Sequence, residues 1–149
     1  MNNVSDMRHN LNNRCNGMRF QNLVKDWFCK NKGSNFETEI GIHIGCPPKI
    51  HRFDIVNSKK KIAIECKSYS WTETDNVPSA KIDALNVAAF YLSLLPKEYD
   101  KYIVILRSIS AKRNESLAEY YFRTNGHLIG EIKIAEYDTK NSVMRVIKK

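Results

Sequence analysis

The chain has 149 residues and carries 24 Lys and Arg against 16 Asp and Glu, a net charge of +8. Its length predicts one domain over residues 1–149, with residues 1–15 flexible. The basic charge favours acidic partners, nucleic acid first. No stretch is apolar enough for a signal peptide or a membrane span, so we expect no membrane partner. The four cysteines lack C-x-x-C spacing, which favours free thiols in the cytoplasm.

The first clear element is a helix that begins near Asn16 and ends before Gly33. Its apolar residues recur at helical spacing and are Phe20, Leu23, Val24, Trp27 and Phe28. A strand follows over residues 36–44, where apolar and polar residues alternate. Glu37 and Glu39 lie on the polar side of that strand, and the two prolines after Cys46 end it.

Residues 51–67 have the pattern of a β-hairpin, two runs rich in β-branched residues around the polar segment 57–61. A tight turn at Lys59 and Lys60 sets Asp54 directly opposite Glu65. Because side chains alternate along a strand, one face then carries Asp54, Glu65 and Lys67. The other, apolar face carries Phe53, Ile55, Ile64 and Cys66. The apolar pattern therefore favours the register that also gathers the charged residues.

Two carboxylates and an ammonium group on one face suit phosphodiester chemistry. Carboxylate oxygens bind a hard cation such as Mg²⁺, which acidifies a bound water and stabilises charge on phosphate. Lys67 would orient that water or offset the charge of the transition state. The alternative is a solvent-facing strand with an ordinary cross-strand ion pair. A second Glu-x-Lys, at Glu131 and Lys133, has no acid on a preceding strand at a matching distance, and we set it aside.

A second helix is predicted from Ser79 to Leu95, between Pro78 and Pro96. It has an apolar stripe of Ile82, Leu85, Ala89 and Leu92, and a second apolar side of Val87, Phe90 and Leu94. We therefore expect this helix to be largely buried as a crossover on a sheet. The apolar run 102–106 predicts a central strand in parallel pairing.

The rest of the chain predicts smaller additions to this core. A basic loop covers residues 107–113, and Asn114 is a candidate N-cap for a short helix that ends at Asn125. A terminal hairpin is expected around the turn Asp138–Asn141.

With these residues in hand, the chain resembles the restriction-endonuclease-like PD-(D/E)XK nucleases. Asp54 matches the metal-binding Asp of that superfamily, and Glu65 and Lys67 match its (D/E)-x-K, although position 53 is Phe rather than Pro. The resemblance implies an α/β core of a helix, a three-strand mixed sheet, a crossover helix and a central strand, here followed by a helix and a hairpin. It also implies that the backbone carbonyl of Cys66 binds the metal.

The resemblance leaves the last metal ligand open. Glu39 is preferred over Glu37 because it lies nearer the centre of its strand. Gln21 stands where some branches of the superfamily carry a Glu, and an amide is the poorer ligand.

The implied activity is Mg²⁺-dependent hydrolysis of double-stranded DNA, with Mn²⁺ as a substitute. A cut through both strands favours a homodimer. Basic residues expected to contact phosphate are Lys81, Arg107, Lys112 and Arg113. Two alternatives stay open: a catalytically silent nucleic-acid-binding module, and a nuclease of the same fold that acts on RNA.

Overall fold

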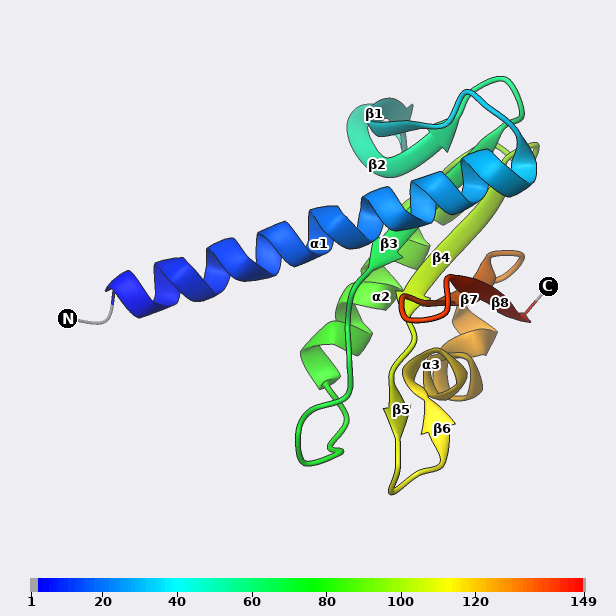
Figure 1. Cartoon of the computed structure of the whole chain (residues 1–149). Coiled ribbons are helices and arrows are strands. Elements are labelled where there is room, and N and C mark those ends of the chain that lie inside the picture. The colour runs from blue at the N-terminus through cyan, green and yellow to red at the C-terminus, as the bar shows by residue number, and fades with distance from the viewer. Residues whose placement is uncertain (1–2, 149) are drawn as a thin grey trace.

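The structure, a computed structural model, describes the backbone of residues 3–148 and the side chains of Met7 and residues 16–147. Six strands form one sheet in the order β1-β2-β3-β4-β7-β8 (Figure 1). Their bounds are β1 Glu37–Ile44, β2 Lys49–Asn57, β3 Ile62–Lys67, β4 Asp100–Leu106, β7 Lys133–Asp138 and β8 Val143–Lys148. The helices are α1 Asn3–Lys32, α2 Ser79–Ser93, α3 Leu117–Asn125 and the 3₁₀ turn Gly126–Leu128. A two-stranded ribbon joins β5 Ile109–Ser110 to β6 Glu115–Ser116.

The sheet is mixed, as the sequence predicted. Strand β3 pairs in parallel with β4, and β4 pairs in parallel with β7, whereas the other neighbours are antiparallel. Helix α2 connects β3 to β4, so the expected crossover is confirmed. In the described part of the chain, no helix is long and apolar enough to cross a membrane.

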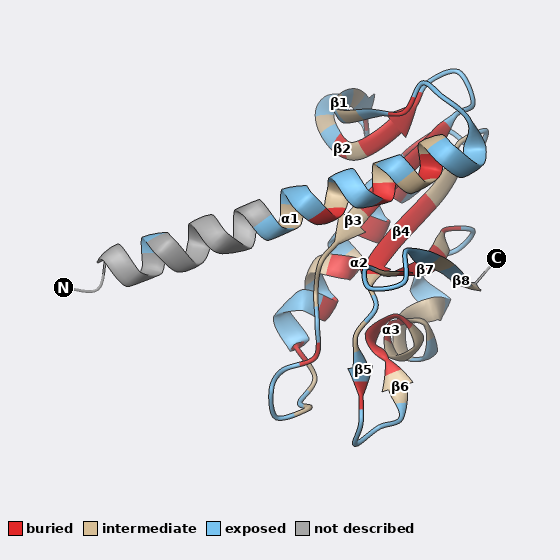
Figure 2. Ribbon diagram, viewed as in Figure 1, coloured by how far each residue is buried: buried red, intermediate tan, exposed pale blue. Residues whose placement is uncertain are grey.

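Helices cover both faces of the sheet. Helix α1 packs on one face with Ile55, Ile64 and Val104, and helices α2 and α3 pack on the other with Ala63 and Ile103. Strands β3 and β4 are therefore buried on both sides (Figure 2). This burial explains why their sequences are continuous apolar runs rather than alternating ones.

Helix α1 begins at Asn3, earlier than the sequence indicated, and ends at Lys32 before Gly33, whose φ is +98°. Its buried face is narrower than expected: Phe20, Val24 and Phe28 are buried, but Leu23 lies on the surface. The flexibility expected for residues 1–15 concerns side chains that, apart from Met7, lie outside the described residues.

The predicted register of the central hairpin is confirmed. Ile55 pairs with Ile64 and Asn57 with Ile62, the alignment that sets Asp54 opposite Glu65. The connection is a four-residue turn over residues 58–61 instead of the two-residue turn expected. The Asn57 side chain stabilises this turn by accepting a hydrogen bond from the backbone N–H of Lys60 at 3.0 Å.

The predicted partition of faces is wrong at Phe53. That side chain packs on the α2 side of the sheet, whereas Ile55 packs on the α1 side. The neighbouring strand contains the cause, because Glu39 has a φ of +56°. A residue in the left-handed region interrupts the pleat, so the side chains before and after it need not alternate. Regular pairing accordingly skips Glu39 and Asp54, between the pairs Thr38–Ile55 and Ile40–Phe53.

The expectation that helix α2 is largely buried is also wrong. Ile82, Leu85 and Leu92 are buried against the sheet as predicted, but Phe90 is 64% exposed. Val87 and Leu94 share that exposed side. The helix lies in an outer layer, so only one of its faces reaches the core and the second apolar side meets solvent.

The short helix α3 has a different N-cap from the one predicted. Ser116 caps it: its hydroxyl accepts from the backbone N–H of Glu119, whose carboxylate accepts from the backbone N–H of Ser116. Asn114, with a φ of +53°, lies instead in the turn between β5 and β6. The expected terminal hairpin is present as β7 and β8.

Candidate functional site

The hairpin brings two carboxylates together. The Oδ2 atom of Asp54, on β2, accepts a hydrogen bond from the backbone N–H of Cys66, on β3, at 2.7 Å. Glu65 precedes Cys66, and its side chain is buried on the α2 side of the sheet beside Ala84 and Ala88. The pair therefore lies where β2 and β3 separate, between the sheet and α2.

Glu65 is an acid without a full set of partners. Its Oε2 lies 3.9 Å from the Nζ of Lys67, and its Oε1 lies 3.5 Å from the Nε2 of His51. Among the described residues, no group makes a hydrogen bond to that buried Oε1. Burial, together with the charge of Asp54, raises the pKa of Glu65 to about 9. At neutral pH the carboxyl thus holds a proton, unless a cation takes its place.

The pKa of Asp54 is shifted by the same surroundings. Burial raises the pKa of its carboxyl, while the Cys66 N–H and the Lys67 ammonium act in the opposite direction. Asp54 raises the pKa of Glu65, whereas the side-chain hydrogen bond from Glu65 lowers the pKa of Asp54, so the pair favours an ionised Asp54 beside a protonated Glu65 whose proton a cation could replace.

Gln21 links helix α1 to this pair. Its amide Nε2 donates to Glu39 Oε1 at 3.1 Å and to the backbone carbonyl of Asp54 at 3.2 Å. The amide is therefore a donor that orients a neighbouring carboxylate. Of the two acids on β1, Glu39 makes this contact, and its charge also acts on Asp54 and Glu65.

The groups around Asp54 and Glu65 offer the type of donor atom that a hard cation binds. In the part of the chain that the structure describes, no group of three or more His, Cys, Asp and Glu side chains is arranged to bind a metal ion. The Asp54 and Glu65 carboxylates and the Cys66 carbonyl are oxygen donors, the type that Mg²⁺ prefers. The unpartnered Oε1 of Glu65 and its raised pKa fit such a cation, which would relieve the cost of the buried charge.

The wall of the site contains His51, which the sequence suggested only as a weak zinc ligand with His43 and Cys46. His51 stacks on Tyr91 of α2, with ring centroids 4.0 Å apart and planes 12° apart, and contacts the edge of Phe53. The rings of His51 and Tyr91, with Glu65 and Lys67, border a cavity of about 270 Å³. Burial lowers the pKa of His51 and favours the neutral ring. Its contact with Tyr91 depends on how α2 packs on the sheet, which the spacing of the sequence does not show.

A second buried carboxylate gives a contrast. Glu136 on β7 is as buried as Glu65, but its Oε1 lies 2.7 Å from Arg145 and 4.0 Å from Arg107. Two guanidinium groups thus neutralise Glu136 within an ion-pair network that extends to Glu119. Both acids have one buried oxygen without a hydrogen bond among the described residues, Oε1 in Glu65 and Oε2 in Glu136. They differ in charge compensation, because the described neighbours of Glu65 are one lysine at 3.9 Å and a histidine with a lowered pKa.

The four predicted phosphate-binding residues make different contacts, although Lys112 and Arg113 are neighbours in the chain. Lys81 lies 5.4 Å from the ring centroid of Tyr69, at the edge of a larger cavity. Arg107 faces Glu136, and Arg113 lies 5.3 Å from the ring centroid of Trp71. The backbone N–H of Lys112 donates to Asp75 at 3.4 Å. The β5–β6 turn is thereby fastened to the loop that follows β3.

Comparison with known proteins gives no family for this chain. No family model matches it, and no curated protein sequence matches it. Among solved structures it is similar to the 1.60 Å crystal structure of an XisH family protein from Nostoc punctiforme PCC 73102. That similarity has a TM-score of 0.49 at 18% identity and covers 87% of this chain and 98% of the other. The strand order and the helices on both faces define the class of protein as α/β, with a mixed sheet between helical layers.

Proposed function

We propose that this protein is a metal-dependent nuclease of restriction-endonuclease-like fold that hydrolyses phosphodiester bonds in DNA. The observation that carries the proposal is the Asp54–Glu65 pair: two partly or fully buried carboxylates, one with an unpartnered oxygen, beside Lys67. A purely structural buried acid is normally neutralised by cations, as Glu136 is by Arg145 and Arg107. Raised carboxyl pKa values in a cavity are typical of functional sites.

Asp54, Glu65 and the backbone carbonyl of Cys66 are the proposed metal-binding groups, with Mg²⁺ as the cation and Mn²⁺ as its substitute. Glu39, which Gln21 orients, is the proposed further carboxylate. A bound divalent cation supplies an acidified water and stabilisation of negative charge on phosphate. The all-oxygen donor set supports a hard cation over zinc, which favours nitrogen and sulfur.

Lys67 is the proposed catalytic cation. Its ammonium lies near Glu65, and the side chain is 23% exposed, so it remains accessible to a substrate. In this position the ammonium would orient the attacking water and offset charge that develops on the phosphate oxygens. His51, kept neutral by burial, forms a wall of the site with Tyr91.

Double-stranded DNA is the proposed substrate, and the net charge of +8 supports an acidic partner. Lys81 and the basic residues Arg107, Lys112 and Arg113 are the proposed phosphate contacts. The nearby Glu136 carboxylate offsets part of the charge of Arg107, so we expect Arg107 to contribute least of the four to phosphate binding. We further propose a cytoplasmic protein that cuts both strands as a homodimer.

The direct test incubates the purified protein with supercoiled plasmid and with RNA of matched length, with Mg²⁺ or with EDTA. We expect the plasmid to be nicked or linearised only with Mg²⁺, and the RNA to stay intact. Cleavage of RNA alone would assign the same site to an RNA-directed enzyme. Binding of DNA without cleavage under any divalent cation would indicate a silent binding module.

A further inference from the structure

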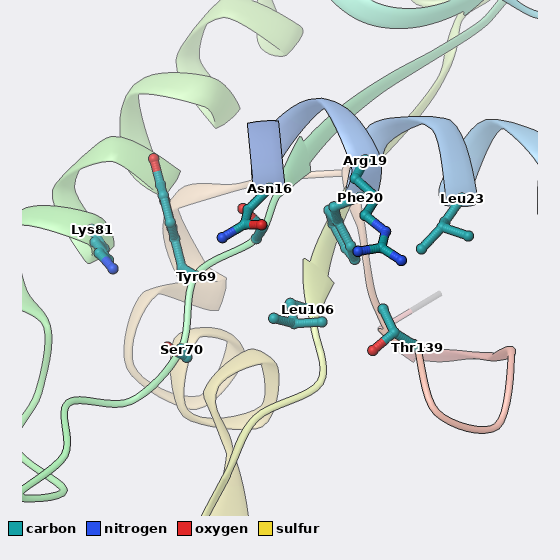
Figure 3. A pocket seen from close by; sticks show the side chains of 10 residues that line it. Asn16, Arg19, Phe20, Leu23, Tyr69, Ser70, Lys81, Leu106 and Thr139 are labelled. Carbon is teal, nitrogen blue, oxygen red and sulfur yellow. The ribbon is translucent and has the colours of Figure 1, made fainter. Parts of the chain in front are cut away.

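A larger cavity, of about 810 Å³, lies beside the candidate site and takes no part in the hydrolysis proposed above. Helix α1 lines one side, and the segment after β3 with the first turn of α2 lines the other (Figure 3). Ser68 follows β3, Leu106 ends β4 and Thr139 follows β7. The cavity thus opens at the carboxyl ends of the three parallel strands, the edge at which α/β proteins commonly bind ligands.

The lining of this cavity is positively charged. Arg19 and Lys81 contribute to it, and no Asp or Glu does. Among residues 16–147, neither of these two side chains forms an ion pair with a carboxylate. In Figure 3 they lie at opposite ends of the lining, with Tyr69 and Asn16 between them. Two separated, uncompensated cations favour a ligand with more than one negative group.

Tyr69 gives the cavity an aromatic surface. The Lys81 ammonium lies on one side of its ring, 5.4 Å from the centroid. Figure 3 shows the ring edge-on, with Asn16 and Leu106 on its other side. An aromatic face of this kind stacks on nucleic-acid bases, and every base offers a flat surface for it. Asn16 and Thr139 add polar groups that can contact a base edge or a sugar.

Some residues that line this cavity are close in sequence to residues that line the smaller cavity around Glu65. Lys67, beside Glu65, is followed directly by Ser68 of the cavity lining. On α2, Lys81 lines this cavity and Ala84, one turn further, lines the smaller cavity around Glu65. The two linings are therefore neighbours in the chain at the end of β3 and again on α2.

We propose that this cavity binds an unpaired nucleotide of the strand whose phosphodiester is cleaved at Asp54 and Glu65. The assignment rests on the proposed function and deepens it. To stack on Tyr69 inside the cavity a base must leave the base-pair stack of a duplex, so we expect the bound nucleotide to come from a single-stranded segment or to be displaced from the duplex. The two cations at opposite ends favour a strand with successive phosphates over a free nucleotide.

The test measures binding of short fluorescent DNAs by anisotropy, with Ca²⁺ in place of Mg²⁺ so that they stay uncut. The probes are a single strand, a blunt duplex, a duplex with a single-stranded overhang, and unlabelled deoxyadenosine monophosphate as competitor. We expect the single strand and the overhang to bind more tightly than the blunt duplex. Tyr69→Ala should weaken their binding roughly 5- to 150-fold, the usual effect of losing one stacked base. Tyr69→Phe, which keeps the stacking face, should retain most of the affinity.

A second pair of variants tests the cations without removing a packed ring. Arg19→Gln and Lys81→Gln should each make the salt dependence of single-strand binding shallower by about 0.7 in the slope of log K against log[salt]. The matched control is Lys97→Gln, an exposed lysine beyond the other end of α2, which should leave the slope unchanged.

The assignment is overturned if Arg19→Gln and Lys81→Gln keep the wild-type slope, or if folded Tyr69→Ala binds the single strand like wild type. Equal affinity for the mononucleotide and the oligonucleotide overturns it as well. These outcomes are distinguishable from failure of the proposed function. A protein that binds single strands through Tyr69 but cuts no nucleic acid would contradict the nuclease and leave the cavity assigned.

Discussion

Asp54 takes the place of a backbone acceptor for Cys66. Regular pairing between β2 and β3 ends at Ile55 and Ile64, and the next bond across the strands runs from the Cys66 N–H to the Asp54 carboxylate at 2.7 Å. The bond fixes the orientation of one proposed metal ligand on a rigid element. It also supports the strand carrying Glu65 at the point where the sheet opens.

We expect Asp54→Asn to be more stable than Asp54→Ala. The Asn side chain keeps an acceptor for the Cys66 N–H, whereas Ala leaves that donor without it, at a cost of about 1–3 kcal/mol. Urea unfolding of both variants in EDTA measures the difference. Equal midpoints would mean that this bond contributes nothing to the free energy of unfolding.

Stability without metal should fall as the pH rises from about 5 to about 9. The ordinary pKa of Glu65 is 4.5 and its folded value is about 9, so the folded chain holds a proton that the unfolded chain releases. This contribution is fully present below the ordinary pKa and is lost as the pH passes the folded one. Glu65→Gln, which cannot ionise, should flatten the decline of urea midpoints with pH.

Mg²⁺ should stabilise the wild type more at the upper end of this range, because the cation competes with that proton. If the midpoints of Glu65→Gln follow the wild-type pH profile, Glu65 is not the group that titrates.

Glu39→Gln should weaken Mn²⁺ or Mg²⁺ binding more than Glu37→Gln. Glu39 is hydrogen-bonded to Gln21, which also holds the Asp54 backbone, and its charge acts on Asp54 and Glu65. Glu37 lies two residues away on the same strand and is a matched control for the loss of charge. Isothermal titration of both variants gives the comparison, and a larger loss in Glu37→Gln would transfer the role to that residue.

Two positions on α2 test which of its apolar sides belongs to the core. Phe90→Ser should change stability by no more than about 0.5 kcal/mol, because that side chain is 64% exposed. Leu92→Ala should cost about 2–5 kcal/mol, since Leu92 is fully buried. Thermal or urea unfolding distinguishes the two, and a large loss at Phe90 would show that its side of the helix is covered in solution.

The central hairpin was predictable because its register depends on local apolar spacing, and a slip of one residue would move Ile55 or Ile64 to the face that carries the charged residues. The face change at Phe53 was not, because it follows from the positive φ of Glu39, and Glu is not a residue type that favours that conformation. The exposure of Phe90 could not be predicted either, since helical spacing shows which side of a helix is apolar but not whether another layer covers that side.

In the candidate site, too, local spacing predicted some contacts and the packing of the helices decided others. Asp54, Glu65 and Lys67 could be brought together from strand alternation and one turn, all within a short span of sequence. The contacts of Gln21 and His51 depend on how α1 and α2 dock on the sheet, which local spacing does not contain.

The most direct test of the central claim compares plasmid cleavage by wild type, Glu65→Gln and Glu131→Gln in Mg²⁺. Glu131 is the exposed acid of the second Glu-x-Lys, and its variant carries the same change of charge. We expect Glu65→Gln to fold and to lose at least about 100-fold in rate, because removing a metal ligand should cost no less than removing its supporting contacts. Glu131→Gln should cleave like wild type. Near-normal cleavage by folded Glu65→Gln, or equal losses in both variants, would contradict the account.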